Sequence, residues 1–110
     1  MTITHVFAGL PVADYDEAVA WYERLLGGPP AMLPNESEAV WQLADTALVY
    51  VVADEERAGN GLLTLIVEDL DAVLSETELE PESVEPVPGV GREALFLDPD
   101  GNAIKFAQLG

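Results

Sequence analysis

Residues 12–19 read Val-Ala-Asp-Tyr-Asp-Glu-Ala-Val, and residues 67–74 read Val-Glu-Asp-Leu-Asp-Ala-Val-Leu. The similarity of these two stretches is the strongest sign of the fold in the sequence. Each copy follows an apolar, strand-like run, residues 3–10 in the first case and residues 62–67 in the second. The aspartate at the third position of each stretch is a good first residue for a helix, since its carboxylate can accept hydrogen bonds from the free N–H groups of the first turn. The repetition predicts two similar halves, each of which begins with a strand and a helix.

Both helices are predicted from apolar positions at helical spacing. The first should end at Gly27-Gly28-Pro29-Pro30, where glycine permits the final turn and proline cannot continue it. The second should end before Pro81, in a run rich in glutamate. Because that run alternates without the ligand spacing of a calcium loop, we interpret it as solvated surface rather than a cation site. Its members are Glu76, Glu78, Glu80, Glu82 and Glu85.

Strand pairs are predicted after each helix. In the first half, residues 39–44 and 47–52 are separated by only two residues, which is typical of a tight hairpin. In the second half, residues 94–97 and 103–107 flank the turn sequence Asp-Pro-Asp-Gly-Asn at 98–102. The sequence therefore predicts an α+β fold.

Neither half is large enough to bury sufficient apolar surface alone. We therefore expect one domain over residues 1–110, with module one at 1–54, a polar connector at 55–61 and module two at 62–110.

Acidic residues dominate the charge, with 21 Asp and Glu against four Lys and Arg, a net charge of −17. This charge repels phosphate groups, so nucleic acids and anionic membranes are not expected partners. It predicts a halophilic protein, because concentrated salt screens the self-repulsion. The chain has no cysteine, and we see neither a signal peptide nor an apolar run long enough to span a bilayer. These features favour a cytoplasmic protein.

Two longer segments carry a family resemblance. Residues 12–27 and residues 98–106 resemble the first-half and second-half signatures of the vicinal oxygen chelate family, and the resemblance runs nearly from end to end. That family includes glyoxalase I, extradiol dioxygenases, fosfomycin-resistance enzymes and bleomycin-binding resistance proteins. The resemblance implies two βαβββ modules in tandem that form a curled mixed sheet around a cavity. It also implies a homodimer, since a second subunit often completes that cavity.

The resemblance also places the metal ligands of the family's enzymes, which are His, Gln or Glu on the first and last strand of each module. The matching positions here are Phe7, Leu62, Lys105 and Val49, the last fixed only to within one or two residues of the hairpin. Three of these side chains have no donor atom, and a protonated lysine repels a cation. We therefore expect no metal ion and no cofactor.

Strand alternation predicts further cavity residues around these positions. His5 lies two residues before Phe7, and it is either an ordinary histidine at a strand end or a general base. Lys105 either binds an anionic ligand or forms a structural ion pair. Trp41 and Tyr50 are expected on the opposite face, under the first helix. The predicted cavity lining is His5, Phe7, Gln42, Val49, Leu62, Thr64 and Lys105, with Gly9 beside them.

Three functions remain open at this point. The protein could bind a small, partly apolar molecule in its cavity. It could be a lyase or dioxygenase that uses another metal arrangement, or His5 and Lys105 as acid and base. It could also be a non-catalytic dimerisation module whose cavity is filled by the side chains of Phe7 and Leu62.

Overall fold

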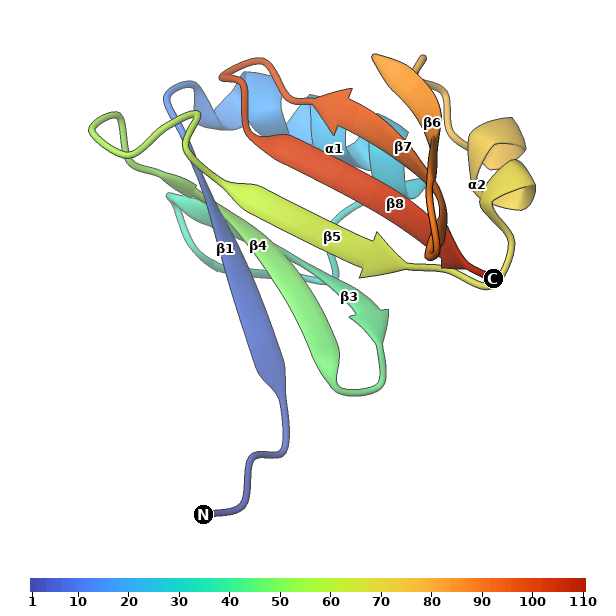
Figure 1. Cartoon of the computed structure of the whole chain (residues 1–110). Coiled ribbons are helices and arrows are strands. Elements are labelled where there is room, and N and C mark those ends of the chain that lie inside the picture. The colour runs from blue at the N-terminus through green and yellow to red at the C-terminus, as the bar shows by residue number, and fades with distance from the viewer.

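The computed structural model describes residues 1–110 and contains two four-stranded sheets and two helices (Figure 1). The first module is formed by β1 (Val6–Val12), α1 (Tyr15–Leu26), β2 (Met32–Asn35), β3 (Glu38–Ala44) and β4 (Ala47–Ala53). The second is formed by β5 (Leu62–Ile66), α2 (Leu70–Glu76), β6 (Ser83–Val87), β7 (Gly91–Leu97) and β8 (Ala103–Leu109). The chain is thus an α+β protein of two tandem βαβββ modules, as the family resemblance implies.

The two sheets have the same topology. Their strand orders are β1-β4-β3-β2 and β5-β8-β7-β6, and in each the first strand runs parallel to the last strand of its module. The register also agrees, because Phe7 pairs with Leu48 and Leu62 with Ala103, partners that differ by 41 in residue number in both cases. Equivalent positions of the modules therefore differ by 55, so that Tyr50 corresponds to Lys105.

Both helices begin at the predicted aspartates. The Asp14 carboxylate accepts a hydrogen bond from the Glu17 N–H at 3.1 Å, and the Asp69 carboxylate accepts one from the Ala72 N–H at 3.2 Å. Helix α1 ends at Gly27, whose left-handed φ of 85° is the conformation that glycine adopts most easily. Neither helix is long and apolar enough to cross a membrane.

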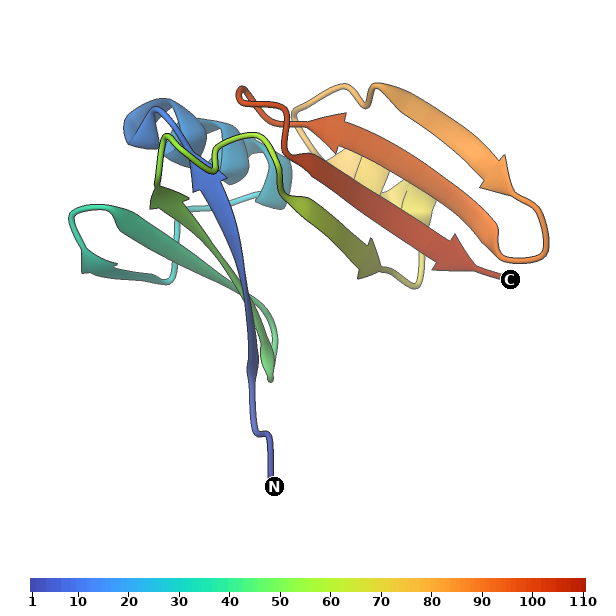
Figure 2. The same ribbon diagram turned by 60° about the vertical axis from the view of Figure 1, so that its left-hand side comes forward.

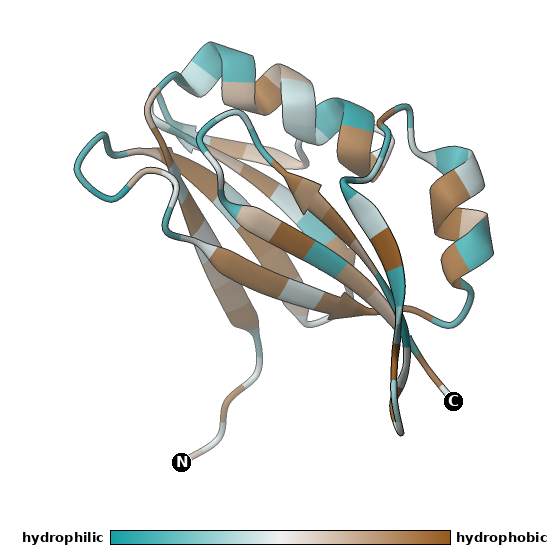
Figure 3. Cartoon of the chain, turned by 45° about the horizontal axis from the view of Figure 1, so that its top comes forward, coloured by the Kyte–Doolittle hydropathy of each residue, from teal (hydrophilic) through white to brown (hydrophobic).

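One hydrophobic core joins the modules. Helix α1 contributes Tyr22 and Leu25, which pack with residues from both sheets, and α2 contributes Leu70. Trp41 is buried as predicted, and its Nε1–H donates to the Gly28 carbonyl at 3.0 Å. Figure 2 shows the two sheets side by side with α2 behind the second, and Figure 3 shows hydrophobic positions running along the strands of both. The sheet residues of this core are Leu10, Val12, Ala39, Trp41, Val49, Val51, Ala94, Phe96, Ile104 and Phe106.

The turn at residues 98–102 fastens module two to module one. Asp98 and Asn102 are buried polar residues. The Asp98 carboxylate accepts hydrogen bonds from the Tyr22 hydroxyl at 2.8 Å and from the Asn102 amide at 2.7 Å. The same amide donates to the Pro11 carbonyl at 2.8 Å, and its oxygen accepts from the Gly61 N–H at 2.6 Å. The turn thereby connects α1, the end of β1 and the connector.

The sequence analysis gives no residue ranges for strands β2 and β6, although the βαβββ modules that the resemblance implies contain them. Both lie at sheet edges, and all four residues of β2 are exposed. Strand β6 lies at the end of the glutamate run and contains Glu85. The five glutamates of that run are all exposed, which agrees with their interpretation as solvated surface.

Candidate functional site

Each sheet has one face packed under the helices and one face that no helix covers. Leu10 points into the core, so Phe7 and Gly9, at the alternate positions of β1, point to the other side. In the second sheet Leu63 and Leu65 face the core, whereas Leu62 and Thr64 do not. We call the uncovered side the open face. Its members include Phe7, Gly9, Gln42, Leu48, Tyr50, Leu62, Thr64, Leu95 and Lys105.

Val49 does not line the open face, so its predicted place in the cavity is wrong. It is 2 % exposed in the core and pairs with Ala8 and Trp41. Tyr50 lies on the open face instead, so its predicted place under the first helix is also wrong. The hairpin sequence alone does not fix how β4 aligns with β1, and an error of one residue moves a side chain to the opposite face. The position in module one that matches Lys105 is therefore Tyr50.

Tyr50 lies across the neighbouring strand at Gly9. A Cβ atom at Gly9 would be only 2.5 Å from Cζ and 2.5 Å from Oη of Tyr50. Glycine therefore leaves the space that the ring occupies. Phe7 precedes Gly9 by two residues on the same face of β1 and is half exposed. Module one thus presents two aromatic side chains on its open face.

Module two presents a charged pair on its open face. Lys105 Nζ lies 3.4 Å from Glu93 Oε1, and both side chains are partly exposed. This is the structural ion pair that the sequence left as one of two alternatives. Thr64 pairs with Lys105 across β5 and β8, and its side chain is exposed. Leu62, at 87 % exposure, stands at the start of the same face.

The remaining predicted residues lie apart from these groups. His5 is exposed, precedes β1 and contacts only the Thr4 hydroxyl through Nδ1, at 3.0 Å. Its ring therefore has no carboxylate partner that would orient it as a general base. Gln42 is exposed on the open face, and its amide donates to the Asp45 carbonyl in the β3–β4 turn.

A hollow of about 360 Å³ lies where the modules meet. Eight of its nine lining residues are hydrophobic, and its volume is within the range of small-molecule sites. Of the predicted site residues it includes only Thr64. The sequence contains one signal that could have located it, the small residues Ala44 and Ala47 on either side of the hairpin turn. The lining is completed by Leu26, Leu43, Leu65, Ile66, Val67 and Phe106.

The comparison with protein families agrees with this architecture. Residues 2–106 match the family model described as Glyoxalase/Bleomycin resistance protein/Dioxygenase superfamily. The chain belongs to this superfamily. No curated protein matches it.

Solved structures of the superfamily resemble the chain over nearly its whole length. A glyoxalase/bleomycin resistance protein from Catenulispora acidiphila DSM 44928 is 47 % identical, with a TM-score of 0.89 and coverage of 96 % of this chain and 98 % of that one. TnmS3, an antibiotic-binding protein from Streptomyces sp. CB03234, is 25 % identical, with a TM-score of 0.76 and coverage of 100 % and 99 %. The bleomycin-binding protein from Streptomyces verticillus, complexed with copper(II)-bleomycin, is 20 % identical, with a TM-score of 0.79 and coverage of 100 % and 99 %, and it shares the fold.

The residues of this superfamily member do not fit the metal that its enzymes hold. With Tyr50 in place of Val49, the four ligand positions carry Phe7, Tyr50, Leu62 and Lys105. A neutral phenol is the only oxygen donor among them, and the ammonium group of Lys105 repels a cation. No group of three or more His, Asp and Glu side chains is arranged to hold a metal ion elsewhere.

Proposed function

We propose that this superfamily member binds a small, partly apolar molecule on its open face without a metal ion. The observation that carries the proposal is the uncovered row of Phe7 and Tyr50 in module one, with Leu62 and Lys105 at the matching positions of module two. Large apolar surfaces that stay exposed on a small protein mark binding sites. The hollow of about 360 Å³ where the modules meet borders this surface at Thr64.

The ligand's chemistry follows from the groups that surround it. The aromatic side chains of module one favour a flat, aromatic ligand, since rings gain from offset or edge-to-face contact. The ion pair between Lys105 and Glu93 supplies a cation that can turn to an anionic group of the ligand. The relative TnmS3 is an antibiotic-binding protein, which supports a small-molecule ligand.

We also propose that two copies of the chain form a homodimer. Within one chain the open faces carry exposed apolar residues on β1 and β5, among them Phe7, Leu62 and Ile66. A second copy placed against these strands would remove that surface from water and enclose the ligand between modules. Analytical ultracentrifugation at several protein concentrations tests the dimer, and a monomer at all of them contradicts it.

The cellular setting is proposed from composition. We propose that the protein works in a salt-rich cytoplasm, because the chain has no cysteine and a net charge of −17.

Fluorescence titration with 8-anilinonaphthalene-1-sulfonate, an aromatic anion, tests ligand binding, with bleomycin as a competitor. The substitution Tyr50→Ala should weaken binding of the probe about tenfold, because it removes an aromatic contact from the open face. Val84→Ala is the matched control, since Val84 is an exposed apolar residue of β6 that pairs with the core residue Ala94 and so lies off the open face.

Equal affinity in the wild type and Tyr50→Ala would contradict binding at the open face. Metal analysis of the purified protein is the second arm, and stoichiometric zinc, nickel, iron or manganese would contradict the metal-free proposal. A failure of every probe to bind would favour the dimerisation module instead.

A further inference from the structure

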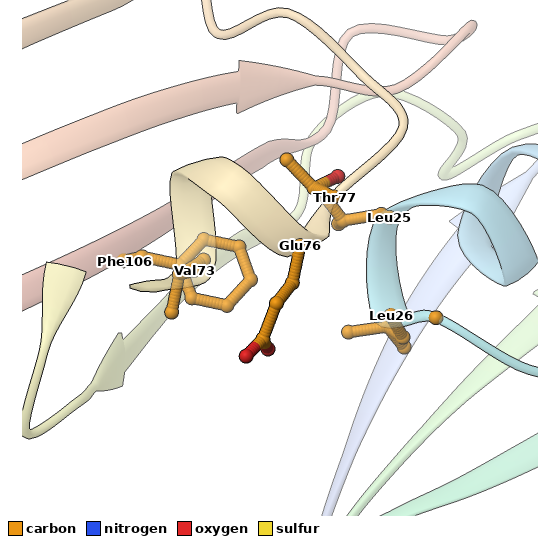
Figure 4. A pocket seen from close by; sticks show the side chains of 7 residues that line it. Leu25, Leu26, Val73, Glu76, Thr77 and Phe106 are labelled. Atoms are coloured by element: carbon orange, nitrogen blue, oxygen red, sulfur yellow. The ribbon is translucent and has the colours of Figure 1, made fainter. Parts of the chain in front are cut away.

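A second cavity lies on the helix side of the molecule, next to the hollow at Thr64, with which it shares Leu26 and Phe106. It measures about 350 Å³ and lies between the C-terminal ends of α1 and α2. Leu25, Leu26, Val73 and Phe106 form its apolar wall (Figure 4). Since α1 belongs to module one and the other elements to module two, the cavity opens at the junction of the modules. Its lining is completed by Gly27, Glu76 and Thr77.

The end of α1, which borders this cavity, has two backbone carbonyls without hydrogen-bond partners. The carbonyls of the last turn of a helix lack partners within the helix. Here the Glu23 carbonyl accepts from the N–H groups of Gly27 and Gly28, and the Arg24 carbonyl accepts from the Glu78 N–H. The next two carbonyls, of Leu25 and Leu26, accept no hydrogen bond. The residues four positions on are Pro29 and Pro30, which have no N–H to donate.

Glu76 supplies a negative charge at the same place. Its side chain extends between Val73 and Phe106 on one side and Leu26 on the other (Figure 4). Glu76 is exposed, and its carboxylate forms neither an ion pair nor a hydrogen bond within the protein, so it is free to meet a ligand at the edge of the cavity. The C-terminal end of a helix also carries partial negative charge, so α1 and Glu76 act in the same direction.

We propose that this cavity is a second ligand site, which takes the primary ammonium group of a small apolar amine. The alkyl part of such a ligand fits the wall formed by Leu25, Leu26, Val73 and Phe106. The ammonium group has three N–H donors, which suit the Glu76 carboxylate and the free carbonyls of Leu25 and Leu26. The site differs from the open face in position and in ligand charge, and it does not depend on the function proposed there.

Nuclear magnetic resonance titration with n-octylammonium chloride tests the proposal, at the lowest KCl concentration that keeps the protein folded. The amide signals of Gly27 and Thr77 should shift, and those of Tyr50 and Thr64 on the open face should not. The substitution Glu76→Gln should raise the dissociation constant about threefold to fivefold, the effect of one partly solvated ion pair. The neutral n-octanol should bind equally to both proteins.

Glu80→Gln is the control for net charge, since Glu80 is exposed, makes the same one-unit change and does not line the cavity. It should leave the affinity for n-octylammonium unchanged. Equal weakening by Glu80→Gln and Glu76→Gln would overturn the site, because the net negative charge of the chain would then explain the binding. Shifts confined to Tyr50 and Thr64 would overturn its location. Octyltrimethylammonium, which has no N–H donor, should bind more weakly, and equal affinity would overturn the role of the carbonyls.

Discussion

Tyr22 is a phenol held in the core against a carboxylate. Burial, followed by the neighbouring charge of Asp98 and the hydrogen bond to it, raises the pKa of Tyr22 far above its ordinary value of 10.0. We therefore expect the hydroxyl to keep its proton, and its hydrogen bond to Asp98, at pH values where a free tyrosine ionises. Asp98 in turn holds Asn102, which donates to the end of β1.

We expect Tyr22→Phe to destabilise the protein by about 1.5–3 kcal/mol at neutral pH, because it removes a hydrogen bond to a charged group. Above pH 10 the tyrosine of the unfolded chain loses its proton while the folded one keeps it, so the wild type loses stability as pH rises. The variant lacks this loss. The difference between the two in free energy of unfolding should therefore shrink by about 1.4 kcal/mol per pH unit above 10. Urea denaturation between pH 8 and about 11 measures it, and a constant difference would contradict the expectation.

Gly9 and Tyr50 form a pair that mutation can separate. We expect Gly9→Ala to displace the Tyr50 ring, since the new methyl group would lie 2.5 Å from it. In a Tyr50→Ala background the same change should be harmless or slightly stabilising, because alanine in a strand restricts the unfolded chain. Urea denaturation of the four proteins should give a coupling of about 1 kcal/mol or more. Additive effects would show that the ring does not occupy this space.

At the residue scale, the sequence predicted on which face of a sheet a residue lies only where strand alternation could be counted from a fixed point. The shared face of Phe7, Leu62 and Lys105 could be predicted because each was counted along its own strand. Val49 was counted across a hairpin, whose register depends on the pairing of β4 with β1. The contact between Tyr50 and Gly9 joins strands that are distant in sequence, and no local sequence pattern predicts it.

At the scale of elements, the end of α1 depends on one glycine. Gly27 has a φ of 85°, and nothing lies within 4 Å of the place where a Cβ would be. We expect Gly27→Ala to destabilise the protein by about 1 kcal/mol through backbone conformation alone. Gly28→Ala is a close control, since Gly28 has the same open surroundings without a positive φ. Thermal unfolding should therefore show a lower melting temperature for Gly27→Ala and not for Gly28→Ala. An equal decrease in both variants would contradict the explanation.

The elements that the sequence predicted are those with a strong local signal. Helices α1 and α2 begin at capping aspartates, and the strands near the hairpin and the 98–102 turn have regular apolar patterns. Strands β2 and β6 contain Pro34 and Pro86 and lie at sheet edges, where one side of the strand needs no hydrogen bonds. Their extended conformation depends more on pairing with β3 and β7 than on their own residues.

For the whole molecule, acidity is the dominant electrostatic feature. Three ion pairs, Arg57–Asp54, Arg92–Asp71 and Lys105–Glu93, involve only three of the 21 acidic side chains. Most carboxylates therefore repel one another without a nearby cation, and the repulsion is greater in the compact state than in the unfolded chain.

We expect the melting temperature to rise with KCl concentration, because the screening length falls from about 10 Å at 0.1 M salt to about 3 Å at 1 M. Differential scanning calorimetry from dilute buffer to multimolar KCl measures the effect. Equal melting temperatures throughout would contradict the halophilic prediction. The same series with sucrose, which carries no charge, separates screening from general effects on protein hydration.

The shared register of the two sheets has an evolutionary consequence. Partners that differ by 41 in both modules point to an ancestral half-length gene that was copied and fused. The backbone pairing is the same in both modules while the exposed residues differ, Gly9 and Tyr50 in one module against Thr64 and Lys105 in the other. Each module thus shows a different set of exposed residues that the same backbone pairing can carry. Exchanging these two pairs between the modules would test whether the backbone of each module tolerates the exposed residues of the other.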